Sequence, residues 1–448
     1  IIMKYDIIII GSGPGGYVAA IRASQLGKKV AIVEKSELGG VCLNWGCIPT
    51  KSLLKSAQVF NYAKHAADYG VKIDGSVNPD LAEMVKRSRG VADGMSKGVQ
   101  FLMKKNKIDV ITGFGKVMPG CKVEVSNKDK SEIYDAENII LATGAHSRQL
   151  PNLPQDGKKI IGYREAMVLD KMPKKMVVVG SGAIGSEFAY FFNSIGVDVT
   201  LVEFLPNIVP LEDPEVSKAL SRSFKKEKMK IMLESSVESV NTSGKLCKVT
   251  IKTKKGEEVV DADIVLSAVG IETNVVGIGL EDVGIKVEKG KVQVDDFYQT
   301  NVPGYYAIGD IVHGPALAHV ASHEGITCVE KIAGLDVEPI DYGNIPACTY
   351  TNPEVASVGM TEAQAKEAGF EIKVGKFPFS ASGKASASGK KDGFVKVVFD
   401  AKYGELLGCH IVGNNATELI AELSVAKALE TTWEEIAMTV HAHPTLSE

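Results

Sequence analysis

The stretch YDIIIIGSGPGG, residues 5–16, decides the fold class of this chain. Its unbroken run of isoleucines predicts a strand buried on both faces, and the run ends directly in a glycine-rich turn. Residues 17–27 then have the character of a helix, and residues 29–35 that of a second strand. This order predicts a dinucleotide-binding βαβ unit, in which the N-terminus of the helix holds a pyrophosphate.

The pattern returns in MVVVGSGAIG, residues 176–185, offset from the first copy by 169 residues. In each copy an acid, Glu34 or Glu203, follows the third glycine by 18 residues and is expected to accept the ribose hydroxyls. One GxGxxG is a weak signal, but two in this context predict two dinucleotide sites; the alternative is two tight turns of a doubly wound sheet. The glycines expected to approach the pyrophosphates are Gly11, Gly13 and Gly16 in the first copy and Gly180, Gly182 and Gly185 in the second.

The surroundings of each copy indicate which cofactor it binds. Two cysteines follow Glu34 closely, so we expect the first dinucleotide to be FAD. Residues 204–213, directly after Glu203, contain no Arg or Lys to balance a ribose 2′-phosphate, and the carboxylate would repel one. The second site is therefore expected to bind NAD, with NADP as the alternative.

Composition limits the choice of partner. With 448 residues, 45% of them hydrophobic, the chain is long enough for two to four domains. A net charge of -4, from 51 basic and 55 acidic residues, gives no reason to expect nucleic acid or an anionic membrane. No apolar run approaches the roughly 20 residues that span a bilayer, and no signal or transit segment is recognisable. These features predict a soluble protein with a small substrate.

Two of the seven cysteines lie close together in ELGGVCLNWGCIPTKSLLKSA, residues 37–57. On a regular helix Cys42 and Cys47 would be too far apart for a disulfide, so bridging them needs a distorted turn, which the neighbouring glycines permit. A helix beginning near Pro49 would stabilise a thiolate, which predicts a redox-active pair. Half of a metal site or two buried thiols are the alternatives. Zinc-type ligand spacing is absent, so no metal is expected, and the other five cysteines are expected to be free.

The segment GGVCLNWGCIPTKSLL resembles the active-site segment of the flavin disulfide oxidoreductases, class I of the pyridine nucleotide-disulfide oxidoreductases. The resemblance covers the whole chain and includes LATGAHSR (141–148), TNVPGYYAIGDI (300–311) and HAHPTLSE (441–448) in the family's order. It implies an α/β fold with two Rossmann-like domains and a C-terminal α+β dimerisation domain. The implied divisions are an FAD domain at 1–147, an NAD domain at 148–275, a central segment returning to the FAD domain at 276–340, and an interface domain at 341–448.

The resemblance also implies roles around the flavin. Asp310 resembles the acid that binds the ribityl chain of FAD, and Ala318 with His319 resembles the segment facing the pyrimidine end. Lys51 and Glu187 would form an ion pair beside the flavin N5; two unrelated solvated charges are the alternative.

Further cofactor contacts are implied at Thr143, Gly144 and Gly270. Gly270 lies in VGIETN, residues 269–274, which departs from the family's usual Gly-Arg-x-Pro-Asn form by losing a cation and a proline.

The last residues carry the implied acid–base chemistry. His443 resembles the family's catalytic base, held by Glu448; the alternative is an ordinary structural histidine. Thr445 and Glu448 also fit a helix capping box, which would make Glu448 an ordinary residue of a first helical turn. Because no helix can follow in this sequence, residues of the family's longer tail are expected to be missing from it. His441 is expected to be either a supporting or a packing residue.

The resemblance is closest to the members of the family that oxidise protein-bound dihydrolipoamide with NAD. His443 would deprotonate the dithiol, the thiolate would attack Cys42, Cys47 would leave against the flavin, and the electrons would pass through FAD to NAD. The implied partners are a second copy that shares the active sites, and lipoyl domains of 2-oxo-acid dehydrogenase complexes or the H protein of glycine cleavage. A bacterial cytoplasm is the expected location, with the mitochondrial matrix as the alternative.

Two other functions are kept as alternatives. One is an NADPH-dependent reductase of another disulfide such as glutathione, but residues 204–213 lack the cation that NADPH needs. The other is a mainly structural flavoprotein subunit, which would not need Cys42, Cys47 and His443 together.

Overall fold

The structure is a computed structural model that describes residues 4–128 and 130–448. The chain forms two compact units. The first contains the described residues of Ile1–Ser52, Val85–Arg148 and Ile271–Ile340, and the second contains Leu53–Met84, Gln149–Gly270 and Asp341–Glu448. The four-part division expected from the sequence is finer than this one and stays a prediction. The α/β fold class is confirmed.

The first unit is built on the isoleucine strand, β1 (Lys4–Ile10), whose central residues Ile7, Ile8 and Ile9 are completely buried. The sheet has the order β3-β2-β1-β6-β5-β4, and β19 pairs with β6. Strands β2, β1, β6, β19 and β3 run parallel, whereas β4 and β5 are antiparallel. The bounds are β2 (Val30–Glu34), β3 (Asp109–Thr112), β4 (Phe114–Met118), β5 (Lys122–Asn127), β6 (Lys130–Leu141) and β19 (Tyr305–Ala307).

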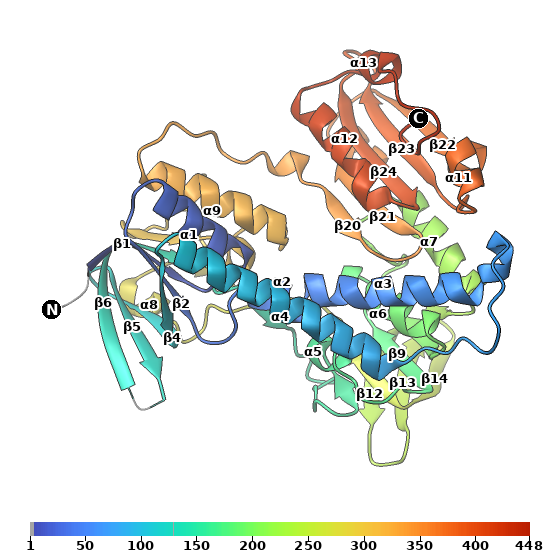
Figure 1. The fold of residues 1–448 in the computed structure, drawn as a ribbon, viewed down its shortest axis with the longest axis horizontal. Coiled ribbons are helices and arrows are strands. Elements are labelled where there is room, and N and C mark those ends of the chain that lie inside the picture. The colour runs from blue at the N-terminus through green and yellow to red at the C-terminus, as the bar shows by residue number, and fades with distance from the viewer. Residues whose placement is uncertain (1–3, 129) are drawn as a thin grey trace. The chain divides into compact units, whose positions relative to one another are not determined.

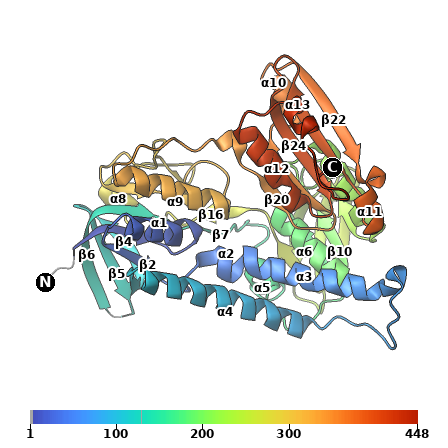
Figure 2. The same ribbon diagram turned by 45° about the horizontal axis from the view of Figure 1, so that its top comes forward.

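Helices α1 (Pro14–Gln25) and α9 (Ala318–Ile332) lie side by side (Figures 1 and 2). They can approach this closely because residue 325 is a glycine: a Cβ on Gly325 would lie only 2.7 Å from the carbonyl oxygen of Gly15. The division between the units runs through α3 and α4. The remaining elements here are α2 (Gly40–Trp45), α3 (Cys47–Lys64), α4 (Leu81–Lys105), β7 (Ala145–Ser147), β16 (Ile271–Thr273), α8 (Leu280–Val283), β17 (Val287–Glu288), β18 (Lys291–Val292) and η2 (Gly309–Ile311).

The second unit repeats the strand–turn–helix pattern. Its parallel sheet has the order β11-β10-β9-β15-β8, and an antiparallel meander follows with the order β12-β13-β14. The elements are η1 (Ala66–Tyr69), β8 (Ile160–Ile161), α5 (Tyr163–Ala166), β9 (Lys175–Val179), α6 (Ala183–Ser194), β10 (Asp198–Val202), α7 (Pro214–Lys226), β11 (Lys230–Met232), β12 (Ser236–Asn241), β13 (Cys247–Thr253), β14 (Gly256–Ala262) and β15 (Ile264–Ser267).

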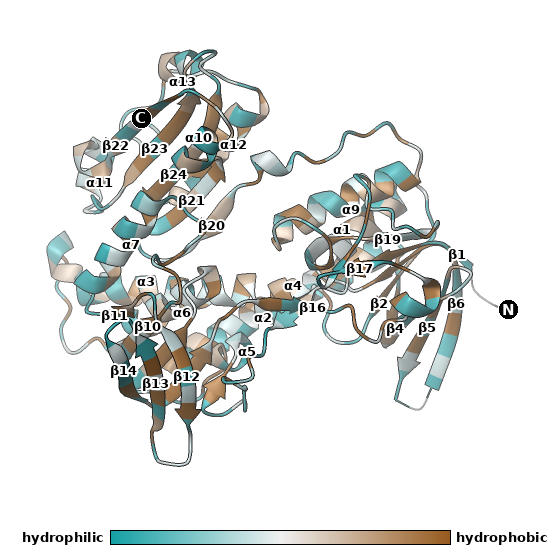
Figure 3. Ribbon diagram, turned by 180° about the vertical axis from the view of Figure 1, so that it is seen from behind, coloured by the Kyte–Doolittle hydropathy of each residue, from teal (hydrophilic) through white to brown (hydrophobic). Residues whose placement is uncertain are grey.

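The C-terminal part of the second unit is an antiparallel sheet with the order β20-β21-β24-β23-β22. Strand β24 is buried at every position, and β23 and β24 form a hydrophobic centre (Figure 3). Its elements are η3 (Tyr342–Asn344), β20 (Ala347–Thr349), β21 (Glu354–Gly359), α10 (Glu362–Glu367), β22 (Ile372–Pro378), η4 (Phe379–Ala381), α11 (Gly383–Ala387), β23 (Phe394–Asp400), β24 (Leu406–Gly413), α12 (Ala416–Ala428) and α13 (Trp433–Met438). Among the residues described, the helices lack the combination of length and apolar character needed to cross a bilayer.

Candidate active site

The cysteine pair lies where α2 passes into α3. Helix α2 ends at Trp45, Gly46 leaves helical geometry with φ -147° and ψ -113°, and α3 begins at Cys47. This break brings the Cα atoms of Cys42 and Cys47 to 4.7 Å, and the two residues form a disulfide. The predicted distortion of the turn is therefore confirmed. The expectation that the other cysteines are free is also confirmed, for Cys121, Cys247, Cys328, Cys348 and Cys409.

Helix α4 supports this turn from behind. The guanidinium group of Arg89 lies 4.2 Å from the centre of the Trp45 ring and donates to the carbonyl oxygen of Asn44. The hydroxyl of Ser88 donates to the carbonyl oxygen of Pro49 at 2.9 Å. These contacts fix both sides of the disulfide to one helix. These contacts could not be predicted from the sequence, because polar residues on a long amphipathic helix form no recognisable motif.

The two glycine turns have the same backbone geometry. Gly11 has a φ of 105° and Gly180 a φ of 95°, a region that strongly favours glycine. A Cβ on Gly16 would lie 2.0 Å from the carbonyl oxygen of Gly11, and one on Gly185 would lie 1.9 Å from that of Gly180. Only glycine at these positions lets each helix begin this close to its strand.

The N-termini of α1 and α6 fit an anionic group. Gly13 and Gly182 are the N-cap residues, and neither helix has a side-chain cap or an acidic residue in its first turn among the described residues. A Cβ on either glycine would meet no atom within 4 Å, so the space in front of both helices is open. Unpaired N–H groups and the helix dipole favour a phosphate at such a place. The two turns therefore fit the pyrophosphates of two dinucleotides.

The two acids are held by the same set of donors in both units. In Glu34, Oε2 accepts from the hydroxyl of Ser12 at 2.6 Å and from its N–H at 3.0 Å, and Oε1 accepts from the N–H of Ser36 at 2.9 Å. In Glu203, Oε2 accepts from the hydroxyl of Ser181 at 2.7 Å and from its N–H at 2.8 Å. Its Oε1 accepts from the N–H two residues further along, at 2.8 Å. The acids were predicted from their spacing in the sequence, whereas the role of the two serines was not.

Asn274 ties together the residues of the LATG segment. Its amide donates to the carbonyl oxygen of Thr143 at 2.9 Å, and the Thr143 hydroxyl donates back to the Asn274 carbonyl oxygen at 2.8 Å. The N–H of Asn274 also donates to the carbonyl oxygen of Gly144, and its Oδ1 lies 2.8 Å from Nδ1 of His146. Gly270 has a φ of 110°. The segment that departs from the family's usual form thus still holds Thr143 and Gly144 by hydrogen bonds.

Asp310 lies in the η2 turn after β19 and is partly buried. Burial raises the pKa of the Asp310 carboxyl above its usual range, and the nearby charge of Lys291 opposes this shift. The turn is fixed by Glu324, which is 1% exposed and accepts from the backbone N–H just before Asp310. Ala318 is the first residue of α9, and His319 follows it with an exposed side chain.

His443 and Glu448 lie together, as expected. Nδ1 of His443 is 2.8 Å from Oε1 of Glu448, and the N–H of Thr445 donates to Oε2 at 2.8 Å. These two contacts, the Thr445 N–H first, lower the pKa of the Glu448 carboxyl. Because the carboxylate occupies Nδ1, Nε2 is the ring nitrogen placed to act as a base. His441 contacts the carboxylate of Glu422 on α12, and this hydrogen bond raises the pKa of His441.

Other predicted pairs are divided between the units. Lys51 belongs to the first unit and Glu187 to the second, where the Glu187 carboxylate is buried and accepts from the N–H of Tyr350 at 2.9 Å. Cys42 and His443 are divided in the same way. Both pairings stay predictions.

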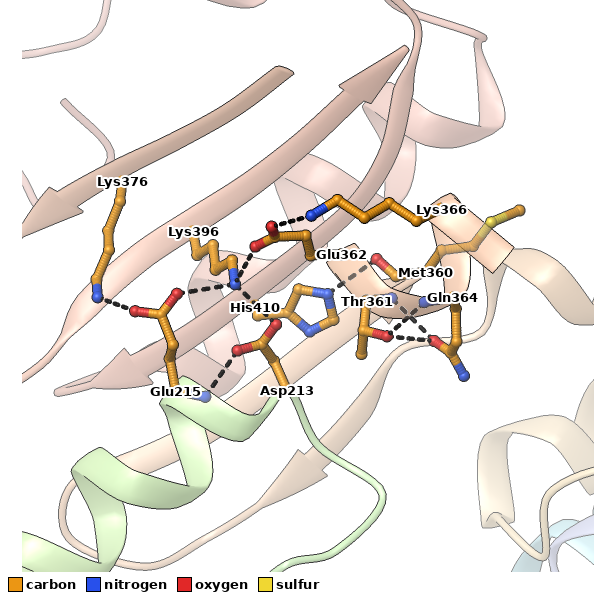
Figure 4. A network of polar contacts seen from close by, with 10 residues as sticks. All are labelled: Asp213, Glu215, Met360, Thr361, Glu362, Gln364, Lys366, Lys376, Lys396 and His410. Atoms are coloured by element: carbon orange, nitrogen blue, oxygen red, sulfur yellow. Dashed lines mark hydrogen bonds and ion pairs between the residues drawn. The ribbon is translucent and has the colours of Figure 1, made fainter. Parts of the chain in front are cut away.

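An ionic cluster around the buried ammonium group of Lys396, in the second unit, was not expected from the sequence (Figure 4). The ammonium group of Lys396 lies 3.0 Å from Asp213, 2.9 Å from Glu215 and 3.1 Å from Glu362. Burial alone would lower the pKa of Lys396, but the hydrogen bonds to these carboxylates outweigh it and raise the pKa. The ring of His410 lies in the same cluster and contacts the carbonyl oxygen of Met360. The cluster joins β23 to the N-terminus of α7.

Comparisons with known proteins agree with these features. Residues 5–325 match the family described as pyridine nucleotide-disulphide oxidoreductase, and residues 345–448 match its dimerisation domain. A dihydrolipoyl dehydrogenase of Rhizobium etli is 50% identical, with 99% of this chain and 96% of the relative covered. One from Zymomonas mobilis is 48% identical, with the same coverage. The crystal structure of LpdA from Mycobacterium tuberculosis superposes with a TM-score of 0.92 at 28% identity and covers 100% of this chain and 97% of that one. Because the family models match residues 5–325 and 345–448 and relatives at 48–50% identity cover 99% of its length, the chain belongs to the pyridine nucleotide-disulphide oxidoreductases.

Proposed function

We propose that this chain is an FAD-dependent dihydrolipoyl dehydrogenase, which oxidises protein-bound dihydrolipoamide to lipoamide and reduces NAD. The observation that carries the proposal is the Cys42–Cys47 disulfide at the first residue of α3. Two further observations support it. The chain has two dinucleotide turns of equal geometry, and relatives of that name match it over 99% of its length.

The two nucleotides are assigned to separate turns. FAD binds at the turn of Gly11, Gly13 and Gly16, with its ribose on Glu34 and further contacts from Lys51, Thr143, Gly144, Asp310 and Ala318. NAD binds at the turn of Gly180, Gly182 and Gly185, with its ribose on Glu203 and a further contact from Gly270. When bound, FAD supplies the two-electron chemistry that connects a dithiol to hydride transfer onto NAD. Lys51 and Glu187 would supply the ion pair expected beside the flavin.

The protein's own residues carry the thiol chemistry. Nε2 of His443 takes the proton of one substrate thiol, and Glu448 holds the ring in the required orientation. The resulting thiolate attacks Sγ of Cys42, which forms a mixed disulfide and breaks the bond to Cys47. Cys47 leaves as a thiolate at the N-terminus of α3, where the helix dipole stabilises negative charge.

The second half of the exchange closes the lipoamide ring. The second substrate thiol attacks the substrate sulfur of the mixed disulfide and gives its proton to Cys42, which is released. The substrate has then lost two electrons and the cysteine pair has gained them. The product is cyclic lipoamide, and the pair is left as a Cys42 thiol and a Cys47 thiolate.

The assembly is proposed on the match to the dimerisation domain. Two copies form a homodimer in which residues 341–448 supply the interface and His443 serves the cysteine pair of the partner. The NAD domain is placed at 148–275, between the FAD domain at 1–147 and the central segment at 276–340. The substrates are lipoyl domains of 2-oxo-acid dehydrogenase complexes or the glycine cleavage H protein, in a bacterial cytoplasm.

An anaerobic titration of the FAD-loaded protein with dihydrolipoamide tests the proposal. We expect a long-wavelength absorption band from a Cys47 thiolate against the flavin, and then rapid turnover with NAD. Glutathione with NADPH serves as the comparison substrate pair. A missing band, or faster reduction of glutathione with NADPH than oxidation of dihydrolipoamide with NAD, would contradict the proposal.

A further inference from the structure

We propose that Ser181 is a positioning residue that fixes the Glu203 carboxylate for the NAD ribose and thereby helps to exclude a ribose 2′-phosphate. Ser12 holds Glu34 in the same way for the FAD ribose. The inference rests on the proposed assignment of NAD to the second turn. It goes beyond that assignment because it gives part of the selectivity to the serine that holds the acid, and not to the acid alone.

The geometry gives the serine hydroxyl a specific task. An ionised carboxylate has about four acceptor positions, and three of those on Glu203 are filled by donors of the chain itself. Two of these donors are backbone N–H groups, which almost any residue would supply. The Ser181 hydroxyl, 2.7 Å from Oε2, is the only one of the three that depends on the side chain at its position. An acceptor position remains for a ribose hydroxyl.

Burial makes this hydrogen bond significant. Ser181 is 0% exposed and Glu203 is 7% exposed, so water has little access to replace a donor that is lost. The turn is also tied to its helix, because the Ser186 hydroxyl donates to the carbonyl oxygen of Ser181 at 2.9 Å. The carboxylate is therefore held in one orientation before any nucleotide arrives.

A fixed carboxylate affects NAD and NADP differently. A ribose hydroxyl can donate to it without any rearrangement, so the binding energy is not reduced by ordering the side chain. The carboxylate would repel a 2′-phosphate, and it could reduce this repulsion only by turning away from its three donors. Selectivity then depends on how firmly the acid is held as well as on its charge.

The occurrence of the same contact in both units supports the inference. Ser12 lies at the equivalent position of the first turn, is also 0% exposed and donates to Glu34 at 2.6 Å. Two turns that are 169 residues apart thus hold their acids by the same side chain and the same backbone groups.

The test measures equilibrium binding of NAD and NADP to the oxidised, FAD-loaded protein by titration calorimetry. Ser181→Ala should raise the Kd for NAD roughly tenfold and change the Kd for NADP less, so that the preference for NAD over NADP becomes smaller. Ser181→Cys keeps the volume but is a poor donor, so it should behave like Ser181→Ala. Ser217→Ala is the matched control: it removes a buried hydroxyl of the same unit that donates to the carbonyl oxygen of Val209 and not to Glu203, and it should leave the Kd for NAD within about twofold. Flavin absorbance and melting temperature show whether each variant is folded.

A double-mutant cycle separates positioning from a structural effect. In a Glu203→Ala background, Ser181→Ala should cause no further loss of NAD affinity, because the hydroxyl acts only through the carboxylate. An equal loss in both backgrounds, wild-type affinity in Ser181→Ala, or restored affinity in Ser181→Cys would overturn the proposal. If Glu203→Ala itself left NAD binding unchanged, the proposed NAD site would be wrong.

An independent arm uses the other turn, where Ser12→Ala should speed the release of FAD. Unchanged FAD release would contradict the matching role of Ser12.

Discussion

The ammonium group of Lys396 lies 3.0 Å from the carboxylate of Asp213, and the two side chains are only 3% and 1% exposed. Asp213 is also the N-cap of α7, since its carboxylate accepts from the N–H of Glu215 at 2.9 Å. The ion pair therefore holds the start of α7 against β23. Asp213 is also the last residue of the segment that begins at Glu203. The ion pair therefore fixes one end of the loop beside the proposed NAD ribose site.

Replacing Lys396 by Met should destabilise the protein by about 3 kcal/mol, because it leaves the buried Asp213 carboxylate without its cation. Thermal or urea unfolding of the FAD-loaded protein measures the change. Lys373→Met is the control, since Lys373 lies on the adjacent strand β22 with an exposed side chain. We expect the control to change stability by at most about 0.5 kcal/mol. Equal effects of the two substitutions would show that the buried pair contributes nothing specific.

Glu212 makes stability depend on pH. Burial raises the pKa of its carboxyl to about 7, the neighbouring charge of Asp213 adds to the shift, and a hydrogen bond from Ser357 opposes it. Because the pKa of this carboxyl in the folded protein is above the usual glutamate value of 4.5, the group's contribution to stability is fully present below about pH 4.5 and is lost as pH rises through about 7.

Glu212→Gln should therefore gain stability relative to the wild type as pH rises from 5 to 8, by about 1 to 3 kcal/mol. Melting temperatures of both proteins across this range measure the difference. A difference between variant and wild type that stays constant from pH 5 to 8 would contradict the raised pKa.

The sequence predicted those parts of the molecule that depend on local pattern. The isoleucine run, the spacing of each acid from its glycines, and the break needed between Cys42 and Cys47 all follow from neighbours along the chain. The resemblance to a known family supplied the order of the segments and the pairing of His443 with Glu448.

The contacts missed by sequence reasoning join positions far apart in the chain. Lys396 and Asp213 are separated by 183 residues, and Asn274 and Thr143 by 131. A single lysine in an alternating strand is ordinarily an exposed residue, and only the packing of α7 against the sheet shows that it is buried. The sequence contains the serines of the two turns, but the orientation of their hydroxyls toward the acids depends on the backbone geometry of each turn.

The two cysteines should behave differently when replaced. Cys42→Ser leaves Cys47 as the thiolate at the start of α3, so the long-wavelength band should appear without substrate while turnover with lipoamide is lost. Cys47→Ser should abolish both the band and turnover. Absorption spectra of the FAD-loaded variants and NADH formation measure the two effects. Full lipoamide activity in Cys42→Ser would show that the roles are assigned wrongly.

The proposed sharing of active sites can be tested with mixed dimers. If His443 serves the partner's cysteines, a dimer of one Cys42→Ser chain and one His443→Gln chain has one site with both defects and one site with neither. Differently tagged chains, purified together in two affinity steps, isolate this mixed dimer. We expect up to about half of the wild-type activity per mixed dimer, because one of the two sites is intact.

The same experiment distinguishes the opposite arrangement. If each chain used its own histidine, every site of the mixed dimer would carry one defect, and activity would stay at the level of the two parent homodimers. Each parent homodimer is therefore a control, and flavin content confirms that all three dimers are loaded equally. Recovery of activity only in the mixed dimer requires that His443 acts across the interface, since neither chain contains a complete set of Cys42 and His443.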